Sequence, residues 1–290
     1  MPVLEIIKLS FNTLKTNKLR ATLTLLGIII GVFSIIAIMT LLNALQAGIE
    51  TGLSELGSNT FQVQKFPAIQ MGGPGGNSKF RNRPDITYDQ ALRLQNTATI
   101  YKYMSLEDYV YEKTFKSEFD KTNPNHYLGG VIPEYLECNN RAIETGRFIS
   151  QTDVDYAKNV AVIGMDVVEK LYPNMNPIGK QIFLDNHPFE VIGVFEPKGE
   201  AFGQSNDNFA LIPITSMHKI YGKNNRTINI AIQAPSKEEY DASVENIISV
   251  LRVIRKVPPG EDNNFEIYSN ESLIGTVNSF TQYFKYGAGF

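Results

Sequence analysis

Histidine and cysteine are the side chains of this sequence with the most reactive chemistry, and their spacing decides what chemistry is open to them. His126, His187 and His218 lie far apart, and no acid or nucleophile accompanies any of them in a catalytic motif. We expect His187 at the exposed tip of a turn. Cys138 is the single cysteine, which excludes an internal disulfide and a zinc site made of several cysteines, and we expect a free, partly buried thiol. The sequence therefore predicts no catalytic site and no metal site.

Three further segments resemble functional motifs but lack what those motifs require. Asp153 and Asp155 are two residues apart in a polar loop, where we expect a solvated cap rather than a metal site. MGGPGGNSK, residues 71–79, is a glycine-rich loop without the G-x-x-x-x-G-K-[ST] pattern that binds phosphate. VAVIGMDVVEK, residues 160–170, contains one glycine, which is too few for a dinucleotide-binding turn. We therefore expect no cofactor on this chain and no enzyme activity of its own.

Charged residues are unevenly distributed along the chain. The 27 basic and 30 acidic residues give a net charge of −3, yet residues 1–20 hold four basic residues and one acidic residue. The remainder is accordingly acidic, which argues against a broad nucleic-acid-binding surface. ATLTLLGIIIGVFSIIAIMTLL, residues 21–42, follows directly and contains no charged side chain. At about 1.5 Å per residue this segment forms a helix of about 33 Å, long enough to cross a membrane.

We therefore predict a transmembrane helix over residues 21–42. Because the basic residues cluster on its N-terminal side, the N-terminus is expected in the cytoplasm and the following domain outside. A cleaved signal peptide and a buried helix of a soluble protein are the alternatives. A signal peptide has a shorter apolar stretch of about 7–15 residues and small residues before its cleavage site. The nearest candidate site, after Ala47, has Leu45 where a small residue is needed.

Small residues recur within this apolar segment. Gly27, Gly31, Ser34 and Ala37 lie at helical spacing, so they share one face of the expected helix. Such a face lets another membrane helix approach closely. We predict that these four residues form a helix-packing site, while the remaining side chains contact membrane lipid.

The segments on either side of the span also carry helical patterns. Residues 1–20 place their apolar side chains on one stripe, which is typical of an amphipathic helix at the cytoplasmic membrane surface. Residues 43–57 continue the apolar spacing, so we expect a stalk helix that Gly57 ends. Residues 271–290 combine another apolar stripe with aromatic residues, as in a helix returning to the membrane. We expect this second stalk to lead to a missing second transmembrane span, so that the sequence is a fragment of a longer protein.

Residues 58–270 have the pattern of a water-soluble α+β domain. Thr87 and Gln90 form a capping-box pattern that predicts the start of a helix. Residues 104–119 alternate in a manner typical of a hairpin or of exposed strands. Residues 181–184 and 189–195 flank the turn-forming DNHP and predict a second hairpin. Other expected strands are 61–64, 126–132, 160–163, 210–214, 228–233 and 265–268. Further helices are expected over 237–253 and, after Gly164, through Val167, Val168 and Leu171, until Pro173 ends the helix. Their irregular alternation predicts mixed sheets.

Several motifs in order give the sequence a strong family resemblance. NKLRATLTLLGIIIGVFSIIAIMTLLNALQAGIETGLSELGSNTFQV resembles the first transmembrane segment of MacB/FtsX-type ABC transporter permeases. GRFISQTDV, NVAVIGMDVVEKLY, NPIGKQI, FEVIGVF and ALIPI resemble the extracytoplasmic core domain of that family, in the same order. The resemblance covers essentially the whole chain. It implies a membrane protein whose N-terminal transmembrane helix precedes a two-lobed mixed α/β domain.

The resemblance also implies an organisation that composition alone does not indicate. The core domain would consist of a porter-like lobe, residues 58–133 and 224–270, and an inserted lobe, residues 134–223. Family permeases have four transmembrane helices, form homo- or heterodimers and associate with two ABC-type ATPase subunits that bind ATP in the cytoplasm. Since 20 residues precede the first span here, the ATPase is expected on a separate chain.

The function that the resemblance implies is that of a permease subunit in the cell inner membrane. ATP hydrolysis by the separate ATPase would move the extracytoplasmic, periplasmic domain and so export or handle a drug, peptide or lipoprotein. A periplasmic adaptor protein and an outer-membrane channel would be further partners. One alternative is an FtsX-like regulator that does not transport but controls a partner such as a cell-wall hydrolase. The other is a single-span sensor or binding protein without an ATPase.

Overall fold

The structure is a computed structural model, and it describes residues 17–53, 59–67, 80, 82–201 and 204–269. The chain divides into two compact units, Met1–Gly48 and Ile49–Phe290, and each is described by itself. Some predicted features lie outside the described residues and stay predictions: most of the amphipathic helix 1–20, Gly57, the glycine-rich loop 71–79 and the second stalk 271–290.

The helix α2 (Lys18–Leu53) is a single helix of 36 residues. Its segment Lys18–Thr40 is long and apolar enough to cross a membrane. No described residue covers the apolar side chains of this segment, and Phe33, for example, is 69% exposed. The polar side chains of Thr22 and Thr40 donate hydrogen bonds of 2.8 Å to the carbonyl oxygens four residues earlier, so they are satisfied within the helix. The helix passes residue 42 without a break, as the predicted stalk requires.

The second unit combines short helices with many strands. Its described helices are α4 (Tyr88–Thr97), α5 (Tyr135–Cys138), α6 (Gln151–Asp155), α7 (Met165–Leu171), α8 (Ile214–Tyr221) and α9 (Tyr240–Ile254). Its described strands are β1 (Thr60–Gln64), β2 (Tyr103–Lys113), β3 (Phe115–Lys116), β4 (His126–Val131), β5 (Ile143–Gly146), β6 (Val160–Ile163), β7 (Gln181–Leu184), β8 (His187–Phe195), β9 (Glu200–Ala201), β10 (Gln204–Ser205), β11 (Phe209–Pro213), β12 (Asn229–Gln233) and β13 (Glu266–Ser269).

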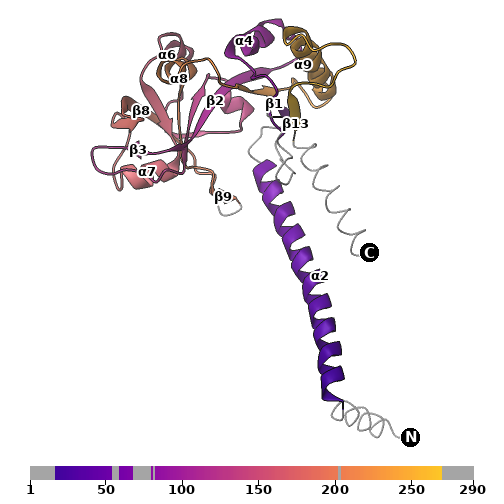
Figure 1. Ribbon diagram of the computed structural model, residues 1–290. Coiled ribbons are helices and arrows are strands. Elements are labelled where there is room, and N and C mark those ends of the chain that lie inside the picture. Colours follow the sequence, from indigo (N-terminus) through magenta and orange to yellow (C-terminus); the bar gives the residue numbers. More distant parts are fainter. Residues whose placement is uncertain (1–16, 54–58, 68–79, 81, 202–203, 270–290) are drawn as a thin grey trace. The chain divides into compact units, whose positions relative to one another are not determined.

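One sheet of 11 strands organises this unit. Its order is β13-β1-β12-β2-β4-β11-β6-β8-β7-β3, with β5 paired to β8, while β9 and β10 form a separate hairpin. The pairs β4–β11 and β6–β8 are parallel and the other described pairs are antiparallel, which confirms the predicted mixed sheet and α+β class. In Figure 1, α4 and α9 lie at the end of the sheet near β1 and β13, and α6, α7 and α8 lie at the other end.

The strand β2 joins these two ends. Its residues 103–107 pair with β12, from Tyr103↔Gln233 to Glu107↔Asn229, and from Asp108 onward it pairs with β4. We call the elements β13, β1, β12, α4 and α9 the β1 half, and the elements β4, β11, β6, β8, β7, β3, β5, α6, α7 and α8 the β8 half. The prediction of a hairpin or exposed strands over 104–119 is wrong. β2 is one central strand because both of its edges find partners, and β3 pairs with β7 instead.

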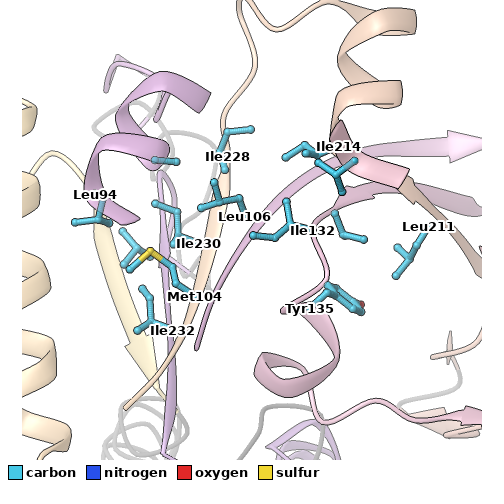
Figure 2. Packing of buried hydrophobic residues seen from close by; sticks show 14 of the residues in the cluster. Leu94, Met104, Leu106, Ile132, Tyr135, Leu211, Ile214, Ile228, Ile230 and Ile232 are labelled. Atoms are coloured by element: carbon cyan, nitrogen blue, oxygen red, sulfur yellow. The ribbon is translucent and has the colours of Figure 1, made fainter. Parts of the chain in front are cut away.

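Apolar side chains pack into two clusters. The larger cluster takes in Leu94 of α4, Leu106 of β2 and Ile230 of β12 together with Ile132 and Ile214, so it passes from one half to the other. Figure 2 shows these residues in a row from Leu94 on one side to Ile214 on the other, with Ile230 and Leu106 between them. The smaller cluster lies within the β8 half, around β6, β7, β8 and α7. Burial of this apolar surface is the main force that holds the unit together.

Several local predictions are confirmed because their signals are short-range. The Thr87 hydroxyl accepts from the backbone N–H of Gln90, whose side chain accepts in return, so the capping box starts α4 as predicted. β7 and β8 form the predicted hairpin, with Asp185 and Asn186 at positive φ in its turn. The boundaries of the porter-like and inserted lobes stay predictions. In the sheet, β4 of the first predicted segment pairs with β11 of the second.

Candidate functional site

The four small residues predicted to pack against another helix lie in α2. All four are exposed. A methyl group added at Gly27 or Gly31 would meet nothing within 4 Å outside the local helix. No described residue of this chain therefore packs on this face.

A charged cluster occupies the place where β2 changes partners. Asp108 is 1% exposed and receives two hydrogen bonds from Arg226, from Nε at 2.6 Å and from Nη2 at 2.5 Å. The second nitrogen also donates to the carbonyl oxygen of Tyr109 at 3.2 Å. This fork geometry is the strongest way to pair an arginine with a carboxylate. Burial alone raises the pKa of Asp108, but the contacts with His218 and Arg226 outweigh it and leave that pKa below its ordinary value.

His218 of α8 completes this cluster. Its Nε2 atom lies 3.5 Å from Oδ2 of Asp108, a distance that makes the contact electrostatic rather than a good hydrogen bond. Its ring meets the ring of Tyr88 edge-on, with centroids 4.7 Å apart. Since Tyr88 belongs to α4, the histidine connects the two halves of the domain.

A cleft of about 610 Å³ lies next to the cluster. It is bounded by the start of α4 and by the segment 223–226 that follows α8. Lys223 and Asp89 face each other in it, with Nζ and Oδ1 3.6 Å apart, and both are well exposed. Such exposed pairs contribute little to stability. The polar lining fits a water-filled space between the halves rather than a closed apolar pocket.

Glu107, the neighbour of Asp108, points to the opposite face of β2. It is 2% exposed and accepts hydrogen bonds from Asn139 Nδ2 and from the Tyr109 hydroxyl, each at 2.7 Å. Burial raises the pKa of Glu107, and these bonds offset it only in part. Two adjacent carboxylates in one strand are thus held differently, one by a cation and one by neutral donors.

A second buried ion pair fixes the base of the β9–β10 hairpin. Arg141 and Asp207 are 3.1 Å apart and their side chains are 5% and 3% exposed. Asp207 also accepts from the backbone N–H groups of Lys198 and Gly199, both at 2.8 Å. The Arg141 guanidinium lies over the ring of Phe209, 4.9 Å from its centroid. The hairpin therefore starts from a rigid, fully paired base.

The histidine, cysteine and aspartate side chains that could take part in chemistry lie in separate parts of the fold. His187 is exposed at the start of β8, as predicted, and Cys138 is a free, buried thiol whose pKa burial raises. Ser150 is the N-cap of α6 and Asp153 completes its capping box, so Asp153 takes part in a cap as expected, but the prediction that Asp153 is solvated is wrong. Its side chain is 0% exposed and pairs with Arg147 at 2.6 Å and Lys158 at 3.1 Å, because the cap folds back under those two cations.

The part of the chain that the structure describes contains no group of three or more His, Cys, Asp or Glu residues able to hold a metal ion. The sequence did not single out Asp108, Arg226 or the Arg141–Asp207 pair. One signal was available, since two adjacent acidic residues interrupt the otherwise apolar and aromatic run MSLEDYVY. Their partners are 118 and 32 residues away and carry no local pattern. The arrangement suits a mechanical joint better than a reaction centre.

Comparison with known proteins identifies the family of the chain. A family model described as "MacB-like periplasmic core domain" matches residues 21–250. The chain is 28% identical over 286 residues to the macrolide export ATP-binding/permease protein MacB of Bdellovibrio bacteriovorus, covering 97% of this chain and 43% of that protein. It is 30% identical over 237 residues to the MacB protein of Neisseria gonorrhoeae, covering 80% of this chain and 35% of that protein. The chain thus spans about two-fifths of the length of such relatives.

Solved structures show the same fold. The periplasmic region of MacB from Actinobacillus actinomycetemcomitans matches with a TM-score of 0.62 at 15% identity, over 78% of this chain and 95% of that one. The extracellular domain of the ABC-type transporter YknZ from Gram-positive bacteria matches with a TM-score of 0.54 at 17% identity, over 72% of this chain and 100% of that one.

Proposed function

The chain belongs to the MacB-like periplasmic core domain family, and from this we propose that it works as a permease subunit of an ABC transporter. In this proposal, ATP hydrolysis in the cytoplasm moves α2, and the movement reaches the extracytoplasmic domain. That domain then exports or handles a cargo such as a drug, peptide or lipoprotein.

The observation that carries the proposal is the way in which the domain is connected. α2 is continuous from the apolar segment to Leu53, and β1 begins at Thr60. β13, which leads into the predicted second stalk, is the antiparallel neighbour of β1, with Phe61 opposite Ser269. The two connections of the domain therefore enter and leave the sheet side by side. Paired stalks attached in this way would deliver a displacement to one strand pair.

The side chains of this strand pair strengthen the connection. Gln64 donates to the Tyr268 hydroxyl at 2.8 Å, and Tyr268 donates in turn to Gln62. Arg83, which lies outside both strands, forms an ion pair with Glu266 of β13 at 2.7 Å and donates to the carbonyl oxygen of Lys65, just after β1, at 3.3 Å. A force applied at the end of β1 or β13 would therefore move both strands together.

The proposal needs partners. These 290 residues contain no phosphate-binding motif, so ATP would be bound by an ABC-type ATPase subunit. A second permease subunit would pack on the small-residue face of α2, which no described residue of this chain covers. A periplasmic adaptor protein and an outer-membrane channel are the partners that export across two membranes would require.

Co-purification tests the proposal. The native protein, extracted from its own membranes in mild detergent, is expected to bring down an ABC-type ATPase in a fixed ratio, identified by mass spectrometry. A tagged single-span membrane protein without this domain is the control. Recovery of no ATPase, or equal recovery with the control, would contradict the proposal. An ATPase recovered together with a cell-wall hydrolase or its activator would favour the FtsX-like role instead.

The proposed orientation has its own test. Lys180 is an exposed residue of the domain, and Lys18 lies at the start of α2. In intact cells, a thiol reagent that does not cross the inner membrane should modify Lys180→Cys and not Lys18→Cys. Cys138 is buried and contributes little background. Modification of Lys18→Cys alone would mean that the protein is inserted the other way round.

A further inference from the structure

We propose that the extracytoplasmic domain bends at the Glu107–Asp108 step of β2, and that the Asp108–Arg226 pair sets the angle between the β1 half and the β8 half. The inference goes beyond the proposed transport function and does not depend on it, because it concerns the domain alone.

The pairing pattern makes this step the narrowest part of the sheet. On one side, the registered pairs of β12 end at Glu107↔Asn229. On the other side, the pairs of β4 begin at Asp108↔Gly130. Among the described strands, no registered pair on either neighbour extends past the step. Elsewhere in a sheet, neighbouring strands brace each other against bending, whereas here β2 is the one described strand that continues across the step, with α5 packed against β2 and β12.

Arg226 is placed to control this joint. Its neighbour Thr227 receives a hydrogen bond at 3.3 Å from the backbone N–H of Ile86, and Ile228 donates at 2.8 Å to the carbonyl oxygen of Ile86. The arginine is therefore tied to the segment just before α4, in the β1 half. Its carboxylate partner, Asp108, is the first residue of β2 that pairs with the β8 half. The two bonds of the fork consequently cross the joint.

Two weaker contacts cross the same face of the joint. The ring of Tyr88 in α4 meets the ring of His218 in α8, and Lys223 lies across the cleft from Asp89. Bending toward this face would narrow the cleft of about 610 Å³, and bending away would open it and separate both contacts. A change in the angle between the two halves would therefore change the width of this cleft.

The apolar cluster that spans the joint does not by itself fix the angle. Leu106, Ile132 and Ile214 keep the halves together, but apolar contact is non-directional and tolerates small rotations. A bidentate arginine–carboxylate pair is directional, so it is satisfied over a narrow range of angles. The apolar contacts therefore resist separation, and the ion pair selects the orientation.

Distance measurement between spin labels tests the proposal. Glu245→Cys on α9 and Tyr156→Cys at the end of α6 place labels on exposed sites of the two halves. The full chain in detergent, mixed with an excess of unlabelled chain so that only distances within one chain are measured, is expected to give one narrow distance peak. Arg226→Gln should turn this peak into a broad or two-peaked distribution, and Lys223→Gln, which removes an exposed contact, should shift it less.

Two further variants keep the test decisive. Arg252→Gln is the matched control, because Arg252 bonds to Pro258, Glu261 and Asn263, all within the β1 half, and should leave the peak unchanged. Should Arg226→Gln fail to fold by circular dichroism, Asp108→Leu/Arg226→Met removes both charges and leaves none buried alone. A folded variant of either kind with the wild-type peak would overturn the proposal, as would equal broadening in Arg252→Gln.

Discussion

Gly27 and Gly31 of α2 have very different surroundings from the tightly packed glycines of the extracytoplasmic domain. A methyl group at Gly27 or Gly31 would meet nothing within 4 Å outside the local helix. At Gly164 it would lie 2.2 Å from the carbonyl oxygen of Asp207, and at Gly129 it would lie 2.6 Å from Cδ2 of Leu211. In the domain, contacts within the chain explain why these residues are small. In α2, no described residue outside the local helix accounts for the small side chains, and a partner helix would.

The largest effect is expected where the neighbour is backbone. Gly164→Ala should lower the free energy of unfolding of the domain by about 3 kcal/mol, because the new methyl group would meet backbone atoms of Asp207 rather than the end of a flexible side chain. Urea unfolding followed by near-ultraviolet circular dichroism of the tyrosines measures this. Gly27→Ala is the control and should leave the domain transition unchanged. Equal stability of the two variants would mean that the packing around Gly164 is loose.

A buried charge gives the next largest effect, and it depends on pH. Burial alone raises the pKa of Asp153, but bonds from Arg147, Ser150 and Lys158 bring it well below the ordinary value of about 3.9. A carboxyl with a lowered pKa stabilises the fold above its unfolded pKa, and this contribution is lost as pH falls through the folded pKa. Asp153→Asn should therefore cost about 2 kcal/mol at pH 7 and progressively less below about pH 4.

Lowering the pH and following circular dichroism should also distinguish α2 from the extracytoplasmic domain. Residues 18–40 of α2 contain no carboxylate, so acid should remove the tyrosine signal of the domain while the helical far-ultraviolet signal of α2 persists. A difference between wild type and Asp153→Asn that stays constant from pH 7 to pH 2 would contradict the assigned role of Asp153.

A smaller effect is expected where the neighbour is the end of a side chain. Gly129→Ala should cost about 1 kcal/mol, because the clash is with Cδ2 of Leu211, which can rotate away. Leu211→Val shortens that side chain and should make Gly129→Ala less costly. A double-mutant cycle by urea unfolding measures this coupling. Strictly additive effects would show that the two residues do not compete for the same space.

The smallest effect on stability is expected in α2, and it comes with a large effect on assembly. Gly27→Leu/Gly31→Leu should leave the unfolding of the domain within about 0.5 kcal/mol of wild type, since no described residue outside the local helix lies within 4 Å of a methyl group at either position. The proposed dimer should nevertheless be lost in analytical ultracentrifugation in detergent. Ile28→Leu/Val32→Leu puts the same number of leucines on another part of the helix surface and should keep the dimer. Unchanged association of the glycine variant would show that the small-residue face is not the packing site.

Whether a feature of this fold can be predicted from the sequence depends on how far apart in the chain its interacting residues lie. Thr87 and Gln90 lie three residues apart and predict the start of α4, and the DNHP turn predicts the β7–β8 hairpin. In each case the determining contacts lie within a few residues. The long apolar helix could be predicted equally well, because an uninterrupted run of apolar residues indicates it without reference to any distant residue.

The parts that could not be predicted depend on distant residues. Alternation in residues 104–119 says that strands are present, but only β12 and β4 show that β2 is a central strand. Glu112, at a φ of 58°, lies where the register of β2 shifts, and the sequence contains no glycine there to mark it. Arg226 and Asp108 are 118 residues apart, so neither indicates the other. The joint in the sheet is therefore visible only once the fold is known.

The neighbouring position of β1 and β13 has a consequence for how such proteins diversify. Phe61 and Ser269 are cross-strand partners, so their Cα atoms lie about 5 Å apart. All of the sequence between them leaves from and returns to nearly the same point. An insertion with adjacent ends makes no demand on the spacing of the helices that carry it. Evolution can therefore enlarge, exchange or delete this domain as one module without rebuilding its host.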